Sequence, residues 1–375
     1  MRVLICPDKF AGTMSALEAA EAISTGWRRV APDDTVRAVP LADGGPGMLD
    51  ALETGLETRR VTVEVTDPLG RHVDAQFLRH DTTAYVESAQ AIGLHLVEPA
   101  RRDVMRATTF GLGQLLMRAA EAGARTIVVG LGGSVTNDGG AGMLTACGMV
   151  PRDASGQPLP YGGGGLRACT SLTGTPLLRG AALVAATDVD NTLCGIRGAS
   201  AIFGPQKGAD DNQVQILDAA LEQYARVLAA DVPGCPPDVA QLPGAGAAGG
   251  VGAALYALGA TRISGAELVS QAVGLDEAMD DADLVITGEG SFDHQSLDGK
   301  LVSMIARAAT ERAVACTVIA GQVRVGRREA ATAGVDRTYS LAEHYGSVEE
   351  AKRRPREGLE AYGERIARRY HPLKS

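Results

Sequence analysis

Short apolar runs alternate with amphipathic stretches at both ends of the chain. Strand-like runs rich in aliphatic and β-branched residues occupy four segments, 2–6, 36–41, 281–290 and 315–323. Between the first two runs, apolar residues recur at Leu17, Ala20, Ile23 and Trp27, which is the spacing of one face of a helix. Because strands that alternate with helices form parallel sheets, the pattern predicts the α/β class.

The pattern changes in the middle of the chain, where turns and glycines are more frequent. Residues 73–98 read as strands joined by turns, and a helix is expected near 108–122, before the buried strand 126–130. The glycine-rich segment 156–166 is typical of an exposed turn.

Length and composition fit two globular domains. The chain has 375 residues, of which 45% are hydrophobic and 22% charged, and such a length favours about two hydrophobic cores. The α/β rhythm is interrupted after residue 75 and resumes at 281. We therefore predict one α/β domain formed by both chain ends, 1–75 and 281–375, and a second α/β domain inserted between them, 76–280.

Charge and cysteine content argue against several classes of function. The formal net charge of −9 is unfavourable for a nucleic-acid partner and for an anionic membrane surface. The six cysteines show no metal-binding spacing, which favours reduced thiols. No apolar run approaches the roughly 20 residues that span a bilayer, and no signal-peptide core is present. We expect a cytoplasmic protein, for which a small anionic substrate and a homo-oligomer both stay open.

The segment 129–144 (VGLGGSVTNDGGAGML) places glycines and small polar residues directly after a predicted strand. Glycines allow backbone N–H groups to approach a ligand closely, and short polar side chains add hydrogen-bonding groups. One interpretation is a tight turn with an Asn or Asp helix cap, and the other is a ligand-binding loop. The candidate ligand-binding residues are Gly132, Gly133, Ser134, Asn137 and Asp138.

Acidic residues follow the carboxyl ends of several predicted strands. One such residue is usually a turn former or a helix cap. However, ligands of open parallel sheets bind off these strand ends, and clustered carboxylates beside glycine loops are typical of a site for Mg²⁺ and phosphate. The acids concerned are Asp8, Asp43, Asp188, Asp190 and Glu289, with Asp293 four residues beyond the last.

Three lysines lie in loops beside glycine or proline and are candidates to offset phosphate charge: Lys9, Lys207 and Lys300. A loop lysine is more often simply solvated. Lys300 is the strongest candidate, because it shares a loop with Asp293 and precedes a predicted helix N-terminus, which favours anions. His294, in the same loop, is a weaker candidate for substrate contact.

The segment 244–249 (GAGAAG) matches the glycine pattern of dinucleotide-binding loops, with Glu267 near the position of a ribose-binding acid. No convincing strand precedes this segment, so close helix packing or a second phosphate-facing loop is the favoured interpretation. A dinucleotide-dependent oxidoreductase stays an alternative. The sequence contains no P-loop pattern, which excludes a P-loop kinase.

Taken together and in order, the loops resemble those of the bacterial glycerate kinase family, the type that lacks a P-loop. The matching segments are PDKFAGT, ADGGPGM, RATTFGLGQLL, GLGGSVTNDGGAGML, TDVDN, FGPQKGA, PGAGAAGG and DLVITGEGSFDHQSLDGK. The sequence departs from the family pattern at Ala11 (usually lysine), Pro46 (usually glutamate), Met48 (usually threonine) and Ser291 (often arginine).

The resemblance implies a fold, an activity and cofactors. It implies a flavodoxin-like domain with a second α/β domain, and phosphorylation of D-glycerate with ATP and Mg²⁺, with 2-phosphoglycerate the favoured product. The loop 129–144 would line the cleft between the domains and contact substrate or phosphate. The departures leave room for a related hydroxy acid as acceptor, or for a non-catalytic nucleotide or metabolite sensor.

Within that family, roles can be assigned to the residues found above. Catalytic roles are expected for Asp43, Asp188, Asp190 and Lys300. Substrate contacts are expected from Asp8, Lys9, Arg102, Ser134, Asn137, Asp138 and Asn191. Phosphate or nucleotide contacts are expected from Gly132, Gly133, Lys207, Gly288 and Asp293, and Mg²⁺ ligands from Asp188 and Glu289.

Overall fold

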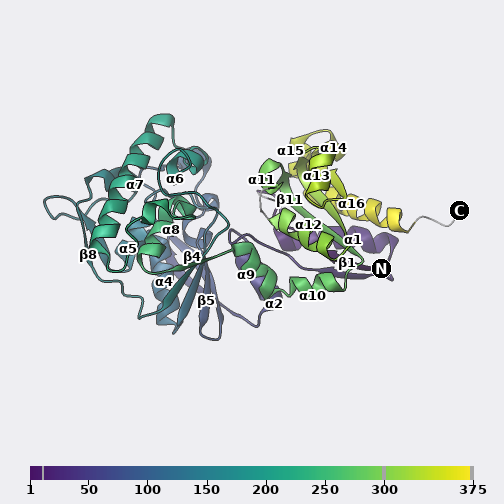
Figure 1. Cartoon of the computed structure of the whole chain (residues 1–375), viewed down its shortest axis with the longest axis horizontal. Helices are drawn as coiled ribbons and strands as arrows, with labels where there is room; N and C mark the ends of the chain where they lie inside the picture. The colour runs from purple at the N-terminus through teal and green to yellow at the C-terminus, as the bar shows by residue number, and fades with distance from the viewer. Residues whose placement is uncertain (11, 298–300, 372–375) are drawn as a thin grey trace. The chain divides into compact units, whose positions relative to one another are not determined.

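The computed structural model describes residues 1–10, 12–297 and 301–371. The chain forms two compact units (Figure 1). The terminal unit comprises Met1–Asp43, Asp50–Leu56 and Ala266–Ser375, and the inserted unit comprises Gly44–Leu49 and Glu57–Gly265. Among the described helices, none is both long and apolar enough to cross a membrane.

The sheet of the terminal unit is fully parallel. Its strands are β1 (Arg2–Ile5), β2 (Thr35–Ala38), β11 (Leu284–Phe292), β12 (Ala315–Val323) and β13 (Arg337–Ser340). They lie in the order β13-β12-β11-β1-β2, and every neighbouring pair is parallel. This is the flavodoxin-like order, in which the direction of winding changes between β1 and β11. The predicted flavodoxin-like domain built from both chain ends is confirmed.

Helices α1 (Ala16–Val30) and α16 (Pro355–Tyr370) pack against each other and against this sheet. Helix α1 begins at a capping box, in which Ser15 and Glu18 satisfy each other's backbone N–H groups. Its predicted apolar spacing is largely confirmed, since Ala20, Ile23 and Trp27 are buried, whereas Leu17 is exposed.

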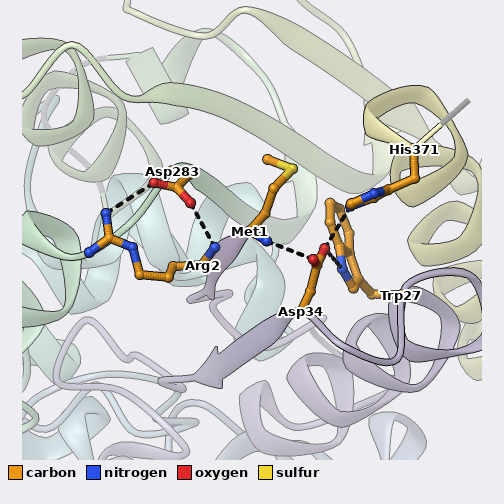
Figure 2. Close-up of polar contacts among 6 residues, drawn as sticks. All are labelled: Met1, Arg2, Trp27, Asp34, Asp283 and His371. Carbon is orange, nitrogen blue, oxygen red and sulfur yellow. Dashed lines mark hydrogen bonds and ion pairs between the residues drawn. The ribbon is translucent and has the colours of Figure 1, made fainter.

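The buried carboxylate of Asp34 joins both ends of the terminal unit (Figure 2). It contacts the amino group of Met1 at 2.6 Å, Trp27 Nε1 at 3.0 Å and His371 Nε2 at 2.8 Å. Burial would raise the pKa of Asp34, but these three hydrogen bonds lower it below its usual value. Segments from opposite ends of the sequence are thus held in one core.

The remaining helices of the terminal unit are short. Helix α12 contacts β11 and β12. The helices are α2 (Met48–Gly55), α9 (Gly265–Ala272), α10 (Leu275–Asp280), α11 (His294–Leu297), α12 (Leu301–Glu311), α13 (Arg327–Thr332), α14 (Leu341–Tyr345) and α15 (Val348–Arg353).

The inserted unit contains a mixed sheet in the order β10-β9-β6-β5-β4-β3. The pairs from β10 to β5 are parallel, whereas β5-β4 and β4-β3 are antiparallel. Strands β7 and β8 form a separate antiparallel pair. The strands are β3 (Arg59–Thr66), β4 (His72–His80), β5 (Thr83–Glu87), β6 (Thr126–Gly130), β7 (Met149–Arg152), β8 (Ser171–Gly174), β9 (Ala182–Ala186) and β10 (Thr261–Ile263).

Helices of the inserted unit flank these strands, and five 3₁₀ segments lie between them. The helices are α3 (Ala89–Ile92), α4 (Phe110–Glu121), α5 (Ala141–Ala146), α6 (Ala199–Phe203), α7 (Asp211–Asp231) and α8 (Ala247–Ala257). The 3₁₀ segments are η1 (Leu94–Leu96), η2 (Pro99–Arg101), η3 (Gly163–Ala168), η4 (Pro205–Lys207) and η5 (Val239–Gln241).

The contact-defined units differ in their boundaries from the predicted 1–75, 76–280 and 281–375. Strand β3 belongs to the inserted unit, because it pairs with β4 along its whole length. Residues 266–280 belong to the terminal unit. The interaction that decides the first boundary is a sheet pairing, which the apolar pattern of a single strand does not reveal.

Candidate active site

Three predicted site residues meet at the strand ends of the terminal unit. The backbone N–H of Asp8 donates to the Gly288 carbonyl at 2.8 Å, so the chain beyond β1 still follows β11. Lys9 Nζ lies 3.2 Å from Asp43 Oδ1 and 3.8 Å from Asp8 Oδ1. This cluster stands at the change of winding direction, where open α/β sheets bind their ligands.

The extended end of β11 carries the next predicted residues. A side chain at Gly288 would put its Cβ 2.1 Å from the Ile319 carbonyl oxygen of β12, so this glycine is required for strand packing. Glu289 is half-buried on the same strand. The backbone N–H of Asp293 donates to Ser296 Oγ at 3.2 Å, and its carboxylate accepts from Ser291 at 3.4 Å.

Two further residues of this loop differ in how the structure treats them. His294 is exposed, and its ring contacts Glu329 at 3.9 Å. Lys300, the strongest lysine candidate from the sequence, lies outside the described residues, so its catalytic role stays a prediction. Ala11 also lies outside the described residues.

In the inserted unit, the glycines after β6 pack directly on the loop 44–47. A Cβ at Gly132 would lie 2.7 Å from Gly45 Cα, and one at Gly133 would lie 2.6 Å from Pro46 Cγ. Gly133 also has a φ of +66°, which favours glycine. Both glycines, predicted to approach phosphate, thus have a packing reason to be glycine.

Lys207 is almost completely buried, with 2% of its surface exposed. Its Nζ donates to the Thr136 carbonyl at 2.6 Å and to Ser134 Oγ at 3.1 Å. Burial lowers the pKa of Lys207 from 10.5 to about 7, and the negative charge of Asp138 partly opposes this shift. The two lysine contacts tie η4 to the loop after β6.

Asp138 is fully buried, and hydrogen bonds from its own unit hold its carboxylate. It accepts from Thr109 N at 2.8 Å and Thr109 Oγ1 at 2.9 Å, and from the backbone N–H groups of Gly140 and Gly142 at 3.1 Å each. Burial raises the pKa of Asp138, although these hydrogen bonds oppose the rise. The cap interpretation fits Asp138 better than direct substrate contact, because its carboxylate joins the starts of α4 and α5.

Asn137 directly follows Thr136, whose carbonyl accepts the hydrogen bond from Lys207. Its Nδ2 donates to Ser200 Oγ at 2.9 Å, whereas its buried Oδ1 has no partner within 1–10, 12–297 and 301–371. The buried Oγ1 of Thr136 is likewise without a described partner. The loop therefore retains unused hydrogen-bonding capacity next to a buried ammonium group.

The GAGAAG segment packs against this loop. Gly139 N–H donates to the Gly249 carbonyl at 3.0 Å, and a Cβ at Gly249 would lie 2.0 Å from the Thr136 carbonyl oxygen. Ala248, Gly249 and Gly250 all have left-handed φ values. The segment follows η5 and a loop rather than a strand, so it lacks the strand that precedes a dinucleotide-binding loop, and its contacts are those of close packing.

The glycine-rich segment 156–166 is only partly the exposed turn that the sequence predicted. Gly162 and Gly163 are buried, and a Cβ at Gly163 would lie 2.2 Å from the Asn137 carbonyl oxygen. The prediction was wrong at this end of the segment, because Gly163 fits against the loop after β6 and Gly162 against Met105.

The residues after β9 have different environments. Asp188 is half-buried, whereas the Asp190 side chain is 74% exposed and pairs with Arg262 Nη2 at 2.6 Å. Asn191 donates from Nδ2 to the Arg197 carbonyl at 2.8 Å, and its own carbonyl accepts from Gly246 N at 2.9 Å. Asp188 is therefore the less exposed of the two acids, and Asn191 connects two loops.

Arg102 lies beside the Lys207 segment. Its Nη1 donates to the Gln206 carbonyl at 3.0 Å, and its buried Nε has no described partner. The inserted unit thus brings together Ser134, Asn137, Asp138 and Lys207. Arg102 contacts Gln206, the residue before Lys207.

Comparison with known proteins gives the family. A model of the glycerate kinase family matches residues 3–371. The chain belongs to the glycerate kinase family. A glycerate kinase of Halalkalibacterium halodurans is 41% identical over 371 residues, which cover 97% of this chain and 97% of the relative. The glycerate 2-kinase of Escherichia coli is 41% identical over 359 residues, which cover 94% and 93%.

A solved structure extends the match to the fold. The crystal structure of a Salmonella typhimurium protein described as a glycerate kinase 2 superposes with a TM-score of 0.78 at 39% identity, and the match covers 99% of this chain and 98% of that one. The chain is accordingly a kinase that transfers phosphate to an alcohol group. Membership of a kinase family implies the use of ATP.

One departure from the family pattern has a structural counterpart. Pro46, where the family usually has glutamate, lies against Gly133. Next to it, Gly47 N–H donates to the buried carboxylate of Glu87 at 2.9 Å. Glu87 ends β5 and was missed in the sequence, although an acid at the end of TAYVE is the same strand-end signal as the others.

Lys207 should make stability depend on pH in a way that its neutral variant does not. Between pH 7 and the ordinary pKa of 10.5, the unfolded chain binds a proton that the folded protein lacks, so stability rises with pH over that range. Relative to Lys207→Met, the wild type should gain about 1.4 kcal/mol of unfolding free energy per pH unit above pH 7.

The measurement is urea unfolding of both proteins at pH 6, 7 and 8.5, below the range in which buried thiols ionise. The difference in unfolding free energy between the two proteins should change little between pH 6 and 7. Above pH 7 it should shift in favour of the wild type. Parallel profiles up to pH 8.5 would mean that Lys207 keeps an ordinary pKa.

Proposed function

We propose that this chain phosphorylates the 2-hydroxyl group of D-glycerate with ATP and Mg²⁺, giving 2-phosphoglycerate. The observation that carries the proposal is the cluster of Asp8, Lys9 and Asp43 at the switch point of a flavodoxin-like sheet. The full-length similarity to an E. coli glycerate 2-kinase supports the acceptor and the position of attack.

The carboxylates suit Mg²⁺ bound mainly through nucleotide phosphates. Mg²⁺ usually takes one or two protein carboxylates together with phosphate and water oxygens. Within the described residues, no group of three or more His, Cys, Asp or Glu could hold a metal, which agrees with a site completed by substrate rather than a closed protein cage. The acids that we assign to the ion are Asp188 and Glu289. Bound Mg²⁺ would neutralise charge on the phosphate oxygens.

The side chains of this chain would supply positioning and charge. Phosphoryl transfer needs an aligned acceptor, a group that takes its proton and cations near the phosphates. We assign orientation of the glycerate hydroxyl to Asp43 and Asp8, whose charge Lys9 partly offsets. Arg102 is the candidate for the substrate carboxylate, because a guanidinium can donate two parallel hydrogen bonds to it.

Other predicted residues fit supporting roles better. Lys207 and Asp138 are buried and hold the loop after β6, and Asn191 connects two loops. Asp190 is paired with Arg262 at the surface. We therefore assign these four to supporting the loops of the inserted unit.

The test is ADP release by the purified protein with ATP, Mg²⁺ and D-glycerate, followed by ³¹P NMR of the product. We expect turnover that EDTA abolishes and a phosphorus signal split by the single proton on C2. A signal split by two protons would assign the 3-hydroxyl instead. Turnover with another small hydroxy acid but not with D-glycerate would replace the acceptor, and ATP binding without turnover on any of them would favour a sensor.

A further inference from the structure

A polar cavity lies in the terminal unit, at the β13 edge of its sheet. It has a volume of about 510 Å³, which is within the range of small-molecule sites. The edge strand β13 forms one wall, and side chains from α13, α14 and α16 form the others. Strand β12 separates β13 from β11, so the cavity is distinct from the strand-end cluster around Lys9.

Four arginines from three elements line this cavity: Arg327 on α13, Arg337 on β13, and Arg365 and Arg369 on α16. Among the described residues that line the cavity, the only acids are Asp336 and Glu343. Asp336 Oδ2 already accepts a hydrogen bond from Cys316 N at 2.7 Å, so it is committed to the sheet. In a chain whose formal net charge is −9, this local excess of positive charge is unusual.

The arginines of the cavity differ from other arginines on or beside helix α16. Arg29 pairs with Glu360 and Glu364, and Arg368 contacts Glu364 at 3.6 Å. By contrast, none of the four cavity arginines has a carboxylate partner within the part of the chain that the structure describes. Their guanidinium groups face a cavity rather than an internal counter-ion.

Two tyrosines pack together on one side of the cavity. The Tyr362 hydroxyl donates to the Ser340 carbonyl at 2.7 Å, and the rings of Tyr339 and Tyr362 pack with centroids 5.0 Å apart. The Arg365 guanidinium lies 5.6 Å from the centroid of the Tyr339 ring, in the range of a cation–π contact. At least one arginine is therefore positioned without an anion.

We propose that this arginine cavity binds a small polyanion, a metabolite that carries two or more phosphate or carboxylate groups. Guanidinium groups recognise both kinds of anion through paired hydrogen bonds, and several of them converging on one cavity favour multiple charge. The site would be an effector site, because it lies beside the edge strand β13, apart from the residues assigned to phosphoryl transfer. This proposal does not depend on which hydroxy acid the chain phosphorylates.

The test uses inorganic pyrophosphate and citrate as probes, by isothermal titration at low ionic strength. The double variant Arg337→Gln/Arg369→Gln should weaken binding of the preferred probe at least about tenfold. The matched control is Arg368→Gln, which removes an arginine from the same helix but outside the cavity, and it should change binding less than about twofold. Preference for pyrophosphate or for citrate separates a phosphorylated ligand from a polycarboxylate.

A second measurement needs no variant. Phenylglyoxal modifies accessible arginines, and peptide mass spectrometry reports each position. The preferred probe should protect Arg327, Arg337, Arg365 and Arg369 and leave Arg368 reactive. Equal binding by the double variant and the wild type, no protection at the four positions, or no binding of either probe would each overturn the proposal.

Discussion

Replacing Asp188 with asparagine should lower turnover about 10²–10³-fold while the melting temperature changes by less than about 2 °C. Asp188 is a half-buried acid just beyond β9, and asparagine keeps its size while removing the charge proposed to hold Mg²⁺. Turnover is measured by coupled ADP release at saturating ATP and D-glycerate, and folding by differential scanning fluorimetry.

The matched comparison is Asp190→Asn, two residues further along the same loop. Its carboxylate is exposed and paired with Arg262, so its loss should cost less than about tenfold. If both variants kept near-normal turnover, the loop after β9 would have no part in the chemistry. If Asp188→Asn lost turnover together with its melting transition, the effect would be structural.

The second large effect is expected on stability. Gly249→Ala should destabilise the protein by about 3 kcal/mol or more, because its new methyl group would lie 2.0 Å from the Thr136 carbonyl oxygen and its φ of +71° is unfavourable for alanine. The same carbonyl accepts the 2.6 Å hydrogen bond of Lys207, so the loop after β6 should shift and turnover should fall as well.

Gly259→Ala is the control for backbone strain alone. Gly259 follows the same helix with a φ of +83°, but a Cβ there would meet nothing within 4 Å. Gly259→Ala should lower the free energy of unfolding by about 1–2 kcal/mol. Calorimetric melting of both variants gives the comparison, and equal losses would show that the contact between Gly249 and Thr136 relaxes without cost.

Much of the terminal unit could be predicted from the sequence. The strand-like runs and the apolar spacing of α1 predicted the parallel α/β sheet, because a buried parallel strand must be apolar on both faces and a helix on a sheet must be apolar on one. The strand-end acids could be found for the same reason. Glu87 was missed only because its strand lies in a region read as a mixture of strands and turns.

The roles of polar residues in the glycine loops could not be predicted in the same way. The sequence predicts a substrate contact for Asp138, and phosphate or nucleotide contacts for Lys207, Gly132 and Gly133. In the structure, Asp138 holds the starts of two helices, Lys207 is buried between loops, and the glycines allow close backbone packing. A polar residue that contacts a ligand and one that supports the loop can be of the same residue type and stand at the same spacing in the sequence.

The sequence by itself determined the family, the α/β class and the set of loops from which the site is drawn. These follow from local properties, which are apolar periodicity, glycine at tight turns and the order of short motifs. Only the tertiary structure decided the first unit boundary at β3, the supporting role of Asp138 and the gathering of four arginines beside β13. Each of these depends on segments far apart in the chain, and pairing, burial and charge between such segments exist only once the chain has folded.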